Sequence, residues 1–207
     1  MNLLDQTTNR LNKGYIDKCQ EYLDYILEHI NNVNIAYNSL YFNNLKPLSE
    51  CKGIEEFEQD QLEKILEQLE LEIQNHDKSK MTDIEFYPYR INHYPTDYEK
   101  EKMQNDSNYM AEVNSLYQEA WKHHYTNNSH HPKYWINDDG SIRDMDIINI
   151  LHMIADWEAM SIKYKSSTID WYINKADDEK AAMSKETKRK VEILLNYLYD
   201  AEINKEG

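Results

Sequence analysis

The sequence predicts an all-α protein, folded as a single-domain helical bundle. Only four of its 207 residues are glycine and four are proline, while 29 % are charged and 40 % are hydrophobic. Such a chain has few of the residues that form tight turns. Apolar residues recur at helical spacing, and no segment reads convincingly as a strand. We expect one domain over 1–207, with a core at about 15–166 and C-terminal helices over 167–203 packed on it.

The first helix is predicted over residues 15–41. Its apolar face consists of residues three or four positions apart: Tyr22, Ile26, Ile30, Val33, Tyr37 and Leu40. His29 lies three positions after Ile26 and four before Val33. We therefore expect this histidine on the buried face of the helix.

The second helix is predicted over residues 54–76, and its end carries two adjacent ionisable residues. The apolar stripe of this helix consists of Ile65, Leu69 and Ile73. The same stripe, continued by three and four positions, reaches His76 and Asp77. Burying ionisable groups is costly unless they are paired or bind a metal. This pair is therefore either a hydrogen-bonded structural element or part of a cation site.

The second half of the chain predicts two more long helices. Pro88 and Pro95 mark irregular chain over 87–98, which we interpret as a loop or lid over a site. A helix over 105–125 follows, and its apolar stripe ends at His124. The next helix, over 144–165, is apolar on nearly every side and should be central. It nevertheless carries Asp156, with His152 one turn before it. Short helices over 168–174 and 184–203 complete the chain.

Four predicted helices thus place ionisable residues on faces that should be buried. These residues are His29, His76 with Asp77, His124 and Asp156. Each alone is readily explained as a hydrogen-bonded core residue, but a single metal centre would account for all of them. Imidazole and carboxylate ligands suit zinc, iron or manganese. We expect one or two such divalent ions, with magnesium as a further candidate.

Four histidines, His123, His124, His130 and His131, fall within nine residues. They are either exposed imidazoles, some of them near a helix C-terminus, or a set suited to a second metal ion or to proton transfer. Lys80, three residues after Asp77, is either an exposed lysine at a helix end or a contact for a substrate anion.

Composition argues against several other functions. A net charge of −15 would repel duplex nucleic acid. No apolar run approaches the roughly 20 residues of a membrane span. The opening, 1–14, is polar and contains Asp5, so we expect no secretory signal there. Cys19 and Cys51 lack metal-ligand spacing, which favours free thiols and a cytoplasmic location.

The order His29, then His76-Asp77, then further histidines, then Asp156 resembles the HD-domain superfamily of metal-dependent phosphohydrolases, whose signature is H…HD…D on a helical bundle. The segment HDKSK is similar to the HDxxK form of that signature. More narrowly, residues 120–135 (AWKHHYTNNSHHPKYW) and 152–161 (HMIADWEAMS) resemble an uncharacterised bacterial and phage branch. That branch commonly has Glu where His152 stands, so the chain departs from the pattern there. The resemblance covers about residues 20–165.

The resemblance implies an HD-like bundle in which a metal-activated water hydrolyses a small phosphoester such as a nucleotide. The implied metal ligands are His29, His76, Asp77, Asp156 and His131. The residues implied in catalysis are Asp77, Lys80, His124 and His130. His124, His130 and His131 are all candidates for a second metal or for acid–base work.

Two alternatives stay open at this point. One is a binding protein without catalysis, for example a phage-encoded factor that sequesters a metal or nucleotide. The other is a di-iron HD-type enzyme that oxidises its substrate. The expected partner is a small phosphoester or nucleotide, without duplex nucleic acid or membrane, and a homodimer is left open.

Overall fold

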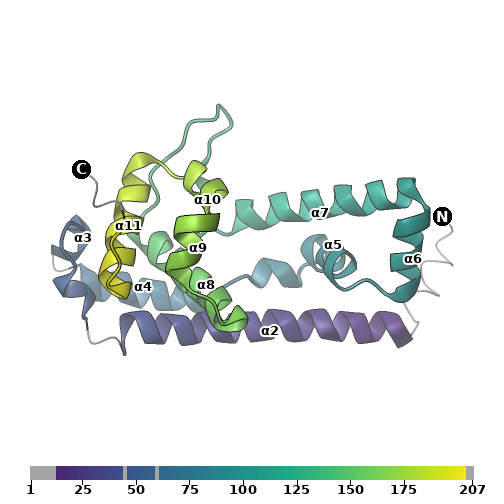
Figure 1. Cartoon of the computed structure of the whole chain (residues 1–207), viewed down its shortest axis with the longest axis horizontal. Coiled ribbons are helices and arrows are strands. Elements are labelled where there is room, and N and C mark those ends of the chain that lie inside the picture. The colour runs from purple at the N-terminus through teal and green to yellow at the C-terminus, as the bar shows by residue number, and fades with distance from the viewer. Residues whose placement is uncertain (1–12, 44–45, 59–60, 204–207) are drawn as a thin grey trace. The chain divides into compact units, whose positions relative to one another are not determined.

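The computed structural model describes residues 13–43, 46–58 and 61–203, and every regular element within these ranges is a helix (Figure 1). The predicted all-α fold class is thereby confirmed. An isolated antiparallel bridge joins Ile136 to Ile142. None of the helices in these ranges has both the length and the apolar character required to cross a membrane. The prediction that residues 1–14 contain no secretory signal is not tested by the structure, because residues 1–12 lie outside the described ranges.

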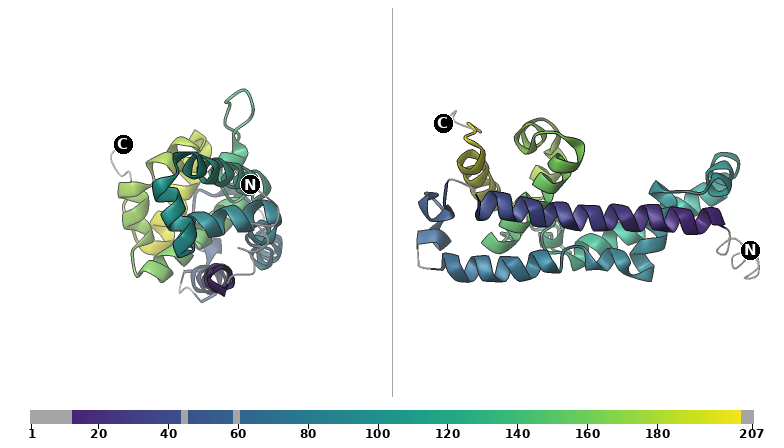
Figure 2. Two further views of the ribbon diagram at one scale, coloured as in Figure 1. Left: turned by 90° about the vertical axis from the view of Figure 1, so that its right-hand side faces the viewer. Right: turned by 90° about the horizontal axis from the view of Figure 1, so that it is seen from below.

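The chain gathers into two compact units, and each is built from two separate stretches of sequence. Unit 1 comprises residues 1–28 and 77–127, and unit 2 comprises residues 29–76 and 128–207. Helix α2 (Lys13–Tyr41) is one uninterrupted helix that contributes to both (Figure 2). It contains no proline, and its only glycine, Gly14, stands at its start, so nothing in its sequence breaks it. The predicted boundaries, a core at about 15–166 and C-terminal helices over 167–203, stay a prediction. Neither unit is a continuous segment with which these boundaries could be compared.

Within its described residues, unit 1 contains three helices, a short 3₁₀ turn and the beginning of α2. The helices are α5 (Asp83–His93), α6 (Asp97–Asn105) and α7 (Ser107–Asn127), and the turn is η2 (Lys78–Met81). Helix α7 packs against α5 and α6. Helix α6 begins with a capping box in which the Thr96 hydroxyl accepts from the Glu99 N–H and the Glu99 carboxylate accepts from the Thr96 N–H.

The prediction of irregular chain over 87–98 was wrong. Helix α5 continues through Pro88 to His93, and α6 begins at Asp97. A proline inside a helix removes one backbone hydrogen bond. Residues directly after it are buried, however, and Arg90 donates to both Glu99 carboxylate oxygens, at 2.5 and 2.7 Å. This burial and the bidentate ion pair stabilise the helical path that proline alone disfavours.

Unit 2 is built around helix α8 (Ile147–Tyr164). Helices α4 (Leu62–Gln74), α9 (Thr168–Lys175) and α11 (Lys185–Tyr199) each pack against it. Five α8 residues are 0 % exposed: Ile150, Leu151, Ile154, Ala155 and Ala159. Burial on several sides is what a centrally placed helix requires, and the sequence predicted this for 144–165.

The remaining elements of unit 2 are short. They are η1 (Leu48–Glu50), α3 (Glu55–Glu58), η3 (Pro132–Trp135) and α10 (Asp177–Ala181). The helix predicted over 54–76 is therefore divided into α3 and α4, and residues 59–60 between them lie outside the described ranges. The connection predicted over 43–53 includes residues 44–45, which also lie outside them.

Candidate metal centre

Unit 2 brings together five ionisable side chains from distant parts of the chain. His29 comes from α2, His76 from the turn after α4, and His130 from the segment before η3, while His152 and Asp156 lie one turn apart on α8. Each of the four imidazoles is at most 4 % exposed. The N–H of His76 bonds to the carbonyl of Ile73 at 3.1 Å, so the end of α4 holds this residue in a defined turn. We call these five residues the histidine cluster.

Three atoms of the histidine cluster form a small triangle. His29 Nε2 lies 3.0 Å from His76 Nε2 and 3.1 Å from Asp156 Oδ1. The third edge, from His76 Nε2 to Asp156 Oδ1, is 3.8 Å. Imidazole nitrogen and carboxylate oxygen are ligand atoms for zinc, iron and manganese.

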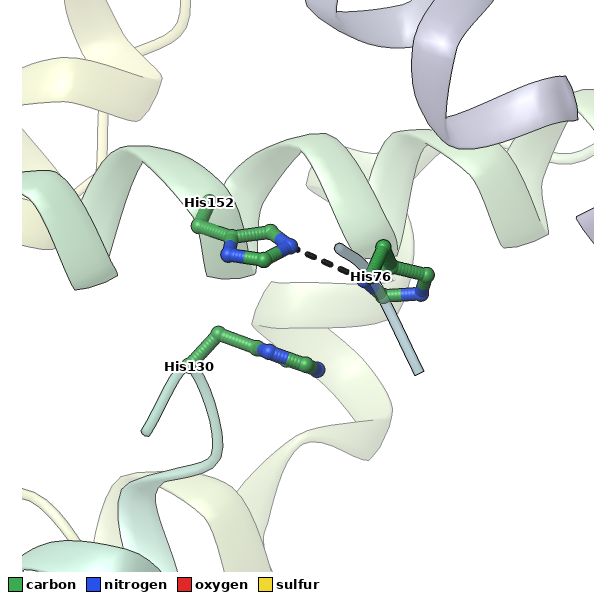
Figure 3. Close-up of side chains that lie close together, drawn as sticks. All are labelled: His76, His130 and His152. Atoms are coloured by element: carbon green, nitrogen blue, oxygen red, sulfur yellow. Dashed lines mark hydrogen bonds between the residues drawn. The ribbon is translucent and has the colours of Figure 1, made fainter. Parts of the chain in front are cut away.

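The opposite side of the His76 ring contacts a second group of imidazoles. His76 Nδ1 lies 2.9 Å from His152 Nε2, the contact drawn as a dashed line in Figure 3, with the His130 ring beside them. One ring nitrogen from each of His76, His130 and His152 lies within 4.8 Å of the other two. These buried groups are therefore able to hold a metal ion.

The charge state of Asp156 follows from its neighbours. Burial by itself would raise the pKa of the Asp156 carboxyl. The contact with His29 and the nearby rings of His29, His76 and His130 outweigh that effect and hold the pKa well below its ordinary value. The histidine cluster thus contains an ionised carboxylate among four imidazoles.

The protons of the His76 ring limit how its contacts can be satisfied. A neutral imidazole carries one N–H, but both ring nitrogens of His76 lie within 3.0 Å of another imidazole nitrogen. His76 can donate in only one of these contacts and must accept in the other. If its Nδ1–H donates to His152, the Nε2 lone pair faces His29 and Asp156.

Three of the residues singled out from the sequence lie in unit 1. Asp77 Oδ2 pairs with Lys80 Nζ at 2.6 Å, and Asp77 Oδ1 lies 3.4 Å from His124 Nε2. Asp77 has a left-handed backbone conformation, with φ of 54°. Aspartate tolerates this region better than most residues, but the conformation still carries strain, and such strain is concentrated at functional sites. The roles predicted for these three residues stay predictions.

Glu85 of α5 is a residue that the sequence reasoning missed. Its side chain is fully buried, with Oε1 2.6 Å from His123 Nδ1 and Oε2 2.9 Å from His124 Nδ1. Burial by itself would raise the pKa of this carboxyl. The contacts with His124 and His123 outweigh that effect and hold the pKa below its ordinary value. The sequence did contain a signal that Glu85 is buried. Glu85 stands three positions before Pro88 and four before Tyr89, and all three lie on the buried face of α5.

Two other histidines of the predicted set lie outside the histidine cluster. His123, which lies off the predicted apolar stripe, is held by Glu85, and its side chain is 28 % exposed. His131, a predicted metal ligand, lies in unit 2 beside His130, with ring centroids 4.4 Å apart. Its role as a ligand stays a prediction.

From the sequence, His152 was placed one turn before Asp156 and marked as a departure from the pattern of the branch that the chain resembles, with no role assigned to it. The structure places it in contact with His76, inside the histidine cluster. The sequence signal was its position one turn before Asp156 on the same helix.

Comparison with known proteins supplies a family for the chain. No curated protein and no solved structure matches it. The comparisons contain no link to the HD-domain superfamily, so that resemblance stays an expectation. A family model described as "Family of unknown function (DUF5662)" matches residues 18–197. Because this match spans most of the sequence, the chain belongs to the DUF5662 family.

Proposed function

We propose that the chain binds a divalent transition-metal ion through His29 Nε2, His76 Nε2 and Asp156 Oδ1, and that it is a metal-dependent hydrolase of a small phosphoester. The observation that supports the metal site is the triangle of these three atoms, with edges of 3.0, 3.1 and 3.8 Å. Hydrolysis of a phosphoester is the more specific part of the proposal. It rests on the chemistry of this ligand set and on the H…HD…D order in the sequence.

The dimensions of the triangle suit one ion. Two ligand atoms about 2.1 Å from a metal are about 3.0 Å apart at a right angle and about 3.4 Å apart in a tetrahedron. From the three edges, the circle through the atoms has a radius of about 1.9 Å. The spacing of the three atoms would therefore allow a single ion to reach all of them at ordinary ligand distances.

His152 supports the proposal through its contact with His76. A histidine that ligates a metal usually donates its other ring N–H to an acceptor, which fixes the tautomer and the ring orientation. His152 Nε2, 2.9 Å from His76 Nδ1, would be such an acceptor when His152 carries its own proton on Nδ1. The same proton arrangement leaves the Nε2 lone pair of His76 directed to the triangle.

Three protein ligands leave open positions on a metal for water and substrate. When bound, the ion would supply Lewis-acid activation of water near neutral pH. The ionised Asp156 contributes negative charge to the ligand set, and the buried rings of His130 and His152 lie close to the ring of the ligand His76. The roles that the sequence predicts for Asp77, Lys80 and His124 in the reaction stay predictions.

Metal content provides the first test. The purified chain would be loaded with manganese, iron, zinc or magnesium, dialysed, and measured by elemental analysis beside His76→Ala and Asp156→Asn. Matched controls are His93→Ala, a histidine of unit 1, and Glu158→Gln, a carboxylate on the same helix as Asp156. We expect the first two variants to lose bound metal and both controls to keep it. Equal metal in all five chains would refute the proposal.

Turnover provides the second test. The metal-loaded chain would be assayed against nucleotides, cyclic nucleotides and generic phosphoesters, with release of phosphate or nucleoside as the readout. Product formation that disappears in Asp156→Asn supports hydrolysis. Tight recovery of a nucleotide without product would instead show a binding protein. A coloured, oxygen-consuming iron form would show the oxidative alternative.

A further inference from the structure

Glu85 lies in unit 1 and has no part in the three-atom triangle of the proposed metal site. It is a fully buried carboxylate, and each of its oxygens contacts a different histidine of α7. His123 and His124 are consecutive in sequence, yet both turn Nδ1 to this one side chain. A buried carboxylate needs such partners, because an unpaired charge in the interior is costly. The contacts at 2.6 and 2.9 Å are in the range of charge-assisted hydrogen bonds.

We propose that Glu85 is a positioning residue that holds His123 and His124 in the Nδ1–H tautomer and thereby presents the Nε2 lone pair of His124 to Asp77. An ionised carboxylate only accepts hydrogen bonds, so the proton in each contact belongs to the imidazole. The low pKa of Glu85 agrees with its being ionised. Each neutral ring then has its lone pair on Nε2.

The consequence is clearest at His124. Its Nε2 lies 3.4 Å from Asp77 Oδ1, while Lys80 pairs with the other oxygen of Asp77 at 2.6 Å. With Nδ1–H donated to Glu85, the Nε2 lone pair faces a carboxylate oxygen that is also an acceptor. Two acceptors facing each other across 3.4 Å can share a cation or a proton taken from a ligand. Glu85 would thus keep the Nε2 lone pair of His124 oriented to accept a proton or to bind a cation.

The competing arrangement involves Ser79. Its hydroxyl lies 3.3 Å from His124 Nδ1 and could donate there if that nitrogen were unprotonated. The Glu85 contact is shorter, at 2.9 Å, and a hydrogen bond to an ionised group is roughly twice as strong as a neutral one. The geometry therefore favours Nδ1–H on His124. The use of His124 in catalysis rests on the proposed function, but the tautomer itself does not.

The test is a long-range ¹H–¹⁵N NMR spectrum of histidine-labelled, metal-free chain at a pH where both rings are neutral. His123→Gln and His124→Gln assign the two rings. We expect Nδ1–H on both rings in the wild type. Glu85→Gln should move at least one ring to Nε2–H, because an amide offers one acceptor oxygen and a donating NH₂. Glu99→Gln, which changes another buried carboxylate of unit 1, should leave both tautomers unchanged.

Two results would overturn the inference. One is Nε2–H on His124 in the wild type, and the other is an unchanged pair of tautomers in a folded Glu85→Gln chain. Should Glu85→Gln fail to fold, the wild-type spectrum decides alone. Because the spectra are recorded without metal, a chain that binds no metal can still show the tautomers, and the two proposals fail separately.

Discussion

Both units bury histidines, but they surround them differently. In unit 1, Glu85 accepts from His123 and His124, and Lys80 pairs with Asp77. The buried carboxylates of Glu85 and Asp77 are therefore paired with side chains of the same unit. In unit 2, the histidine cluster contains four buried histidines and a single carboxylate, and His76 contacts other imidazoles at both ring nitrogens. Burial of a histidine is thus no sign of metal binding by itself. The partner of each ring nitrogen distinguishes the two cases.

The difference has a physical basis. A carboxylate and an imidazole N–H satisfy each other, whereas imidazoles that contact each other must alternate donor and acceptor roles. A cation resolves such a contact by taking the lone pairs of several rings at once. We therefore expect unit 2 to respond to metal and unit 1 to respond to the loss of its own carboxylates.

The largest expected effect is stabilisation by metal. A ligand that binds only the folded chain adds about 4 kcal/mol to the free energy of unfolding at a thousand times its dissociation constant. We expect a gain of this order when the metal-free wild type receives its preferred ion, and a return to the starting value with a chelator. His76→Ala should show no gain, and His93→Ala should behave as wild type. Thermal unfolding with and without metal measures this gain. An equal gain in His76→Ala would contradict the expectation that the histidine cluster of unit 2 binds the metal.

The second expected effect concerns Glu85. Replacing it by alanine removes two charge-assisted hydrogen bonds and leaves two imidazole donors without their acceptor. We expect a loss of about 3 kcal/mol in the free energy of unfolding. Denaturant unfolding of Glu85→Ala in metal-free buffer measures this. A loss below about 0.5 kcal/mol would show that unit 1 does not depend on this carboxylate.

A third effect is a dependence of stability on pH through Glu99. Burial raises the pKa of Glu99, but the contacts with Arg90 and Thr96 outweigh it and lower the pKa below its ordinary value. A carboxyl with a lowered pKa in the folded state stabilises the protein above its unfolded pKa, and this contribution is lost as the pH falls through the folded pKa. We expect Glu99→Gln to lose about 2 kcal/mol at neutral pH and to flatten the acid side of the stability curve.

Unfolding of the wild type and of Glu99→Gln from pH 7 downward measures this dependence, with Glu186→Gln as the control. Glu186 is an exposed carboxylate of unit 2 that pairs with Arg189. Identical acid profiles for the wild type and Glu99→Gln would contradict the prediction.

The smallest expected effect lies at Asp77, whose backbone is left-handed. Asparagine and alanine both remove the ion pair with Lys80, but asparagine tolerates this conformation and alanine does not. Asp77→Asn should therefore be about 1 kcal/mol more stable than Asp77→Ala. Equal stability of the two variants would show that the strained backbone relaxes in the variants. Elemental analysis of the same two chains would also test the predicted role of Asp77 as a metal ligand.

The sequence by itself determined the helices and much of what they bury. Apolar periodicity is a local property, so it located α2, α7 and α8 to within a few residues and marked His29 as buried. Asp156 was marked in the same way but is only partly buried, with 16 % of its side chain exposed. The path of α5 through Pro88 could not be predicted in this way, because the stabilising contact between Arg90 and Glu99 joins two helices.

The tertiary structure decided which buried residues meet. Periodicity says which face of a helix is buried but not which other face it contacts, since packing brings distant parts of the chain together. His29 Nε2 and Asp156 Oδ1 thus lie 3.1 Å apart although the two residues are 127 positions apart in the sequence. For the same reason the sequence assigned no role to His152, and Glu85 was missed. The role of each depends on a partner from another segment: His76 for His152, and the two histidines of α7 for Glu85.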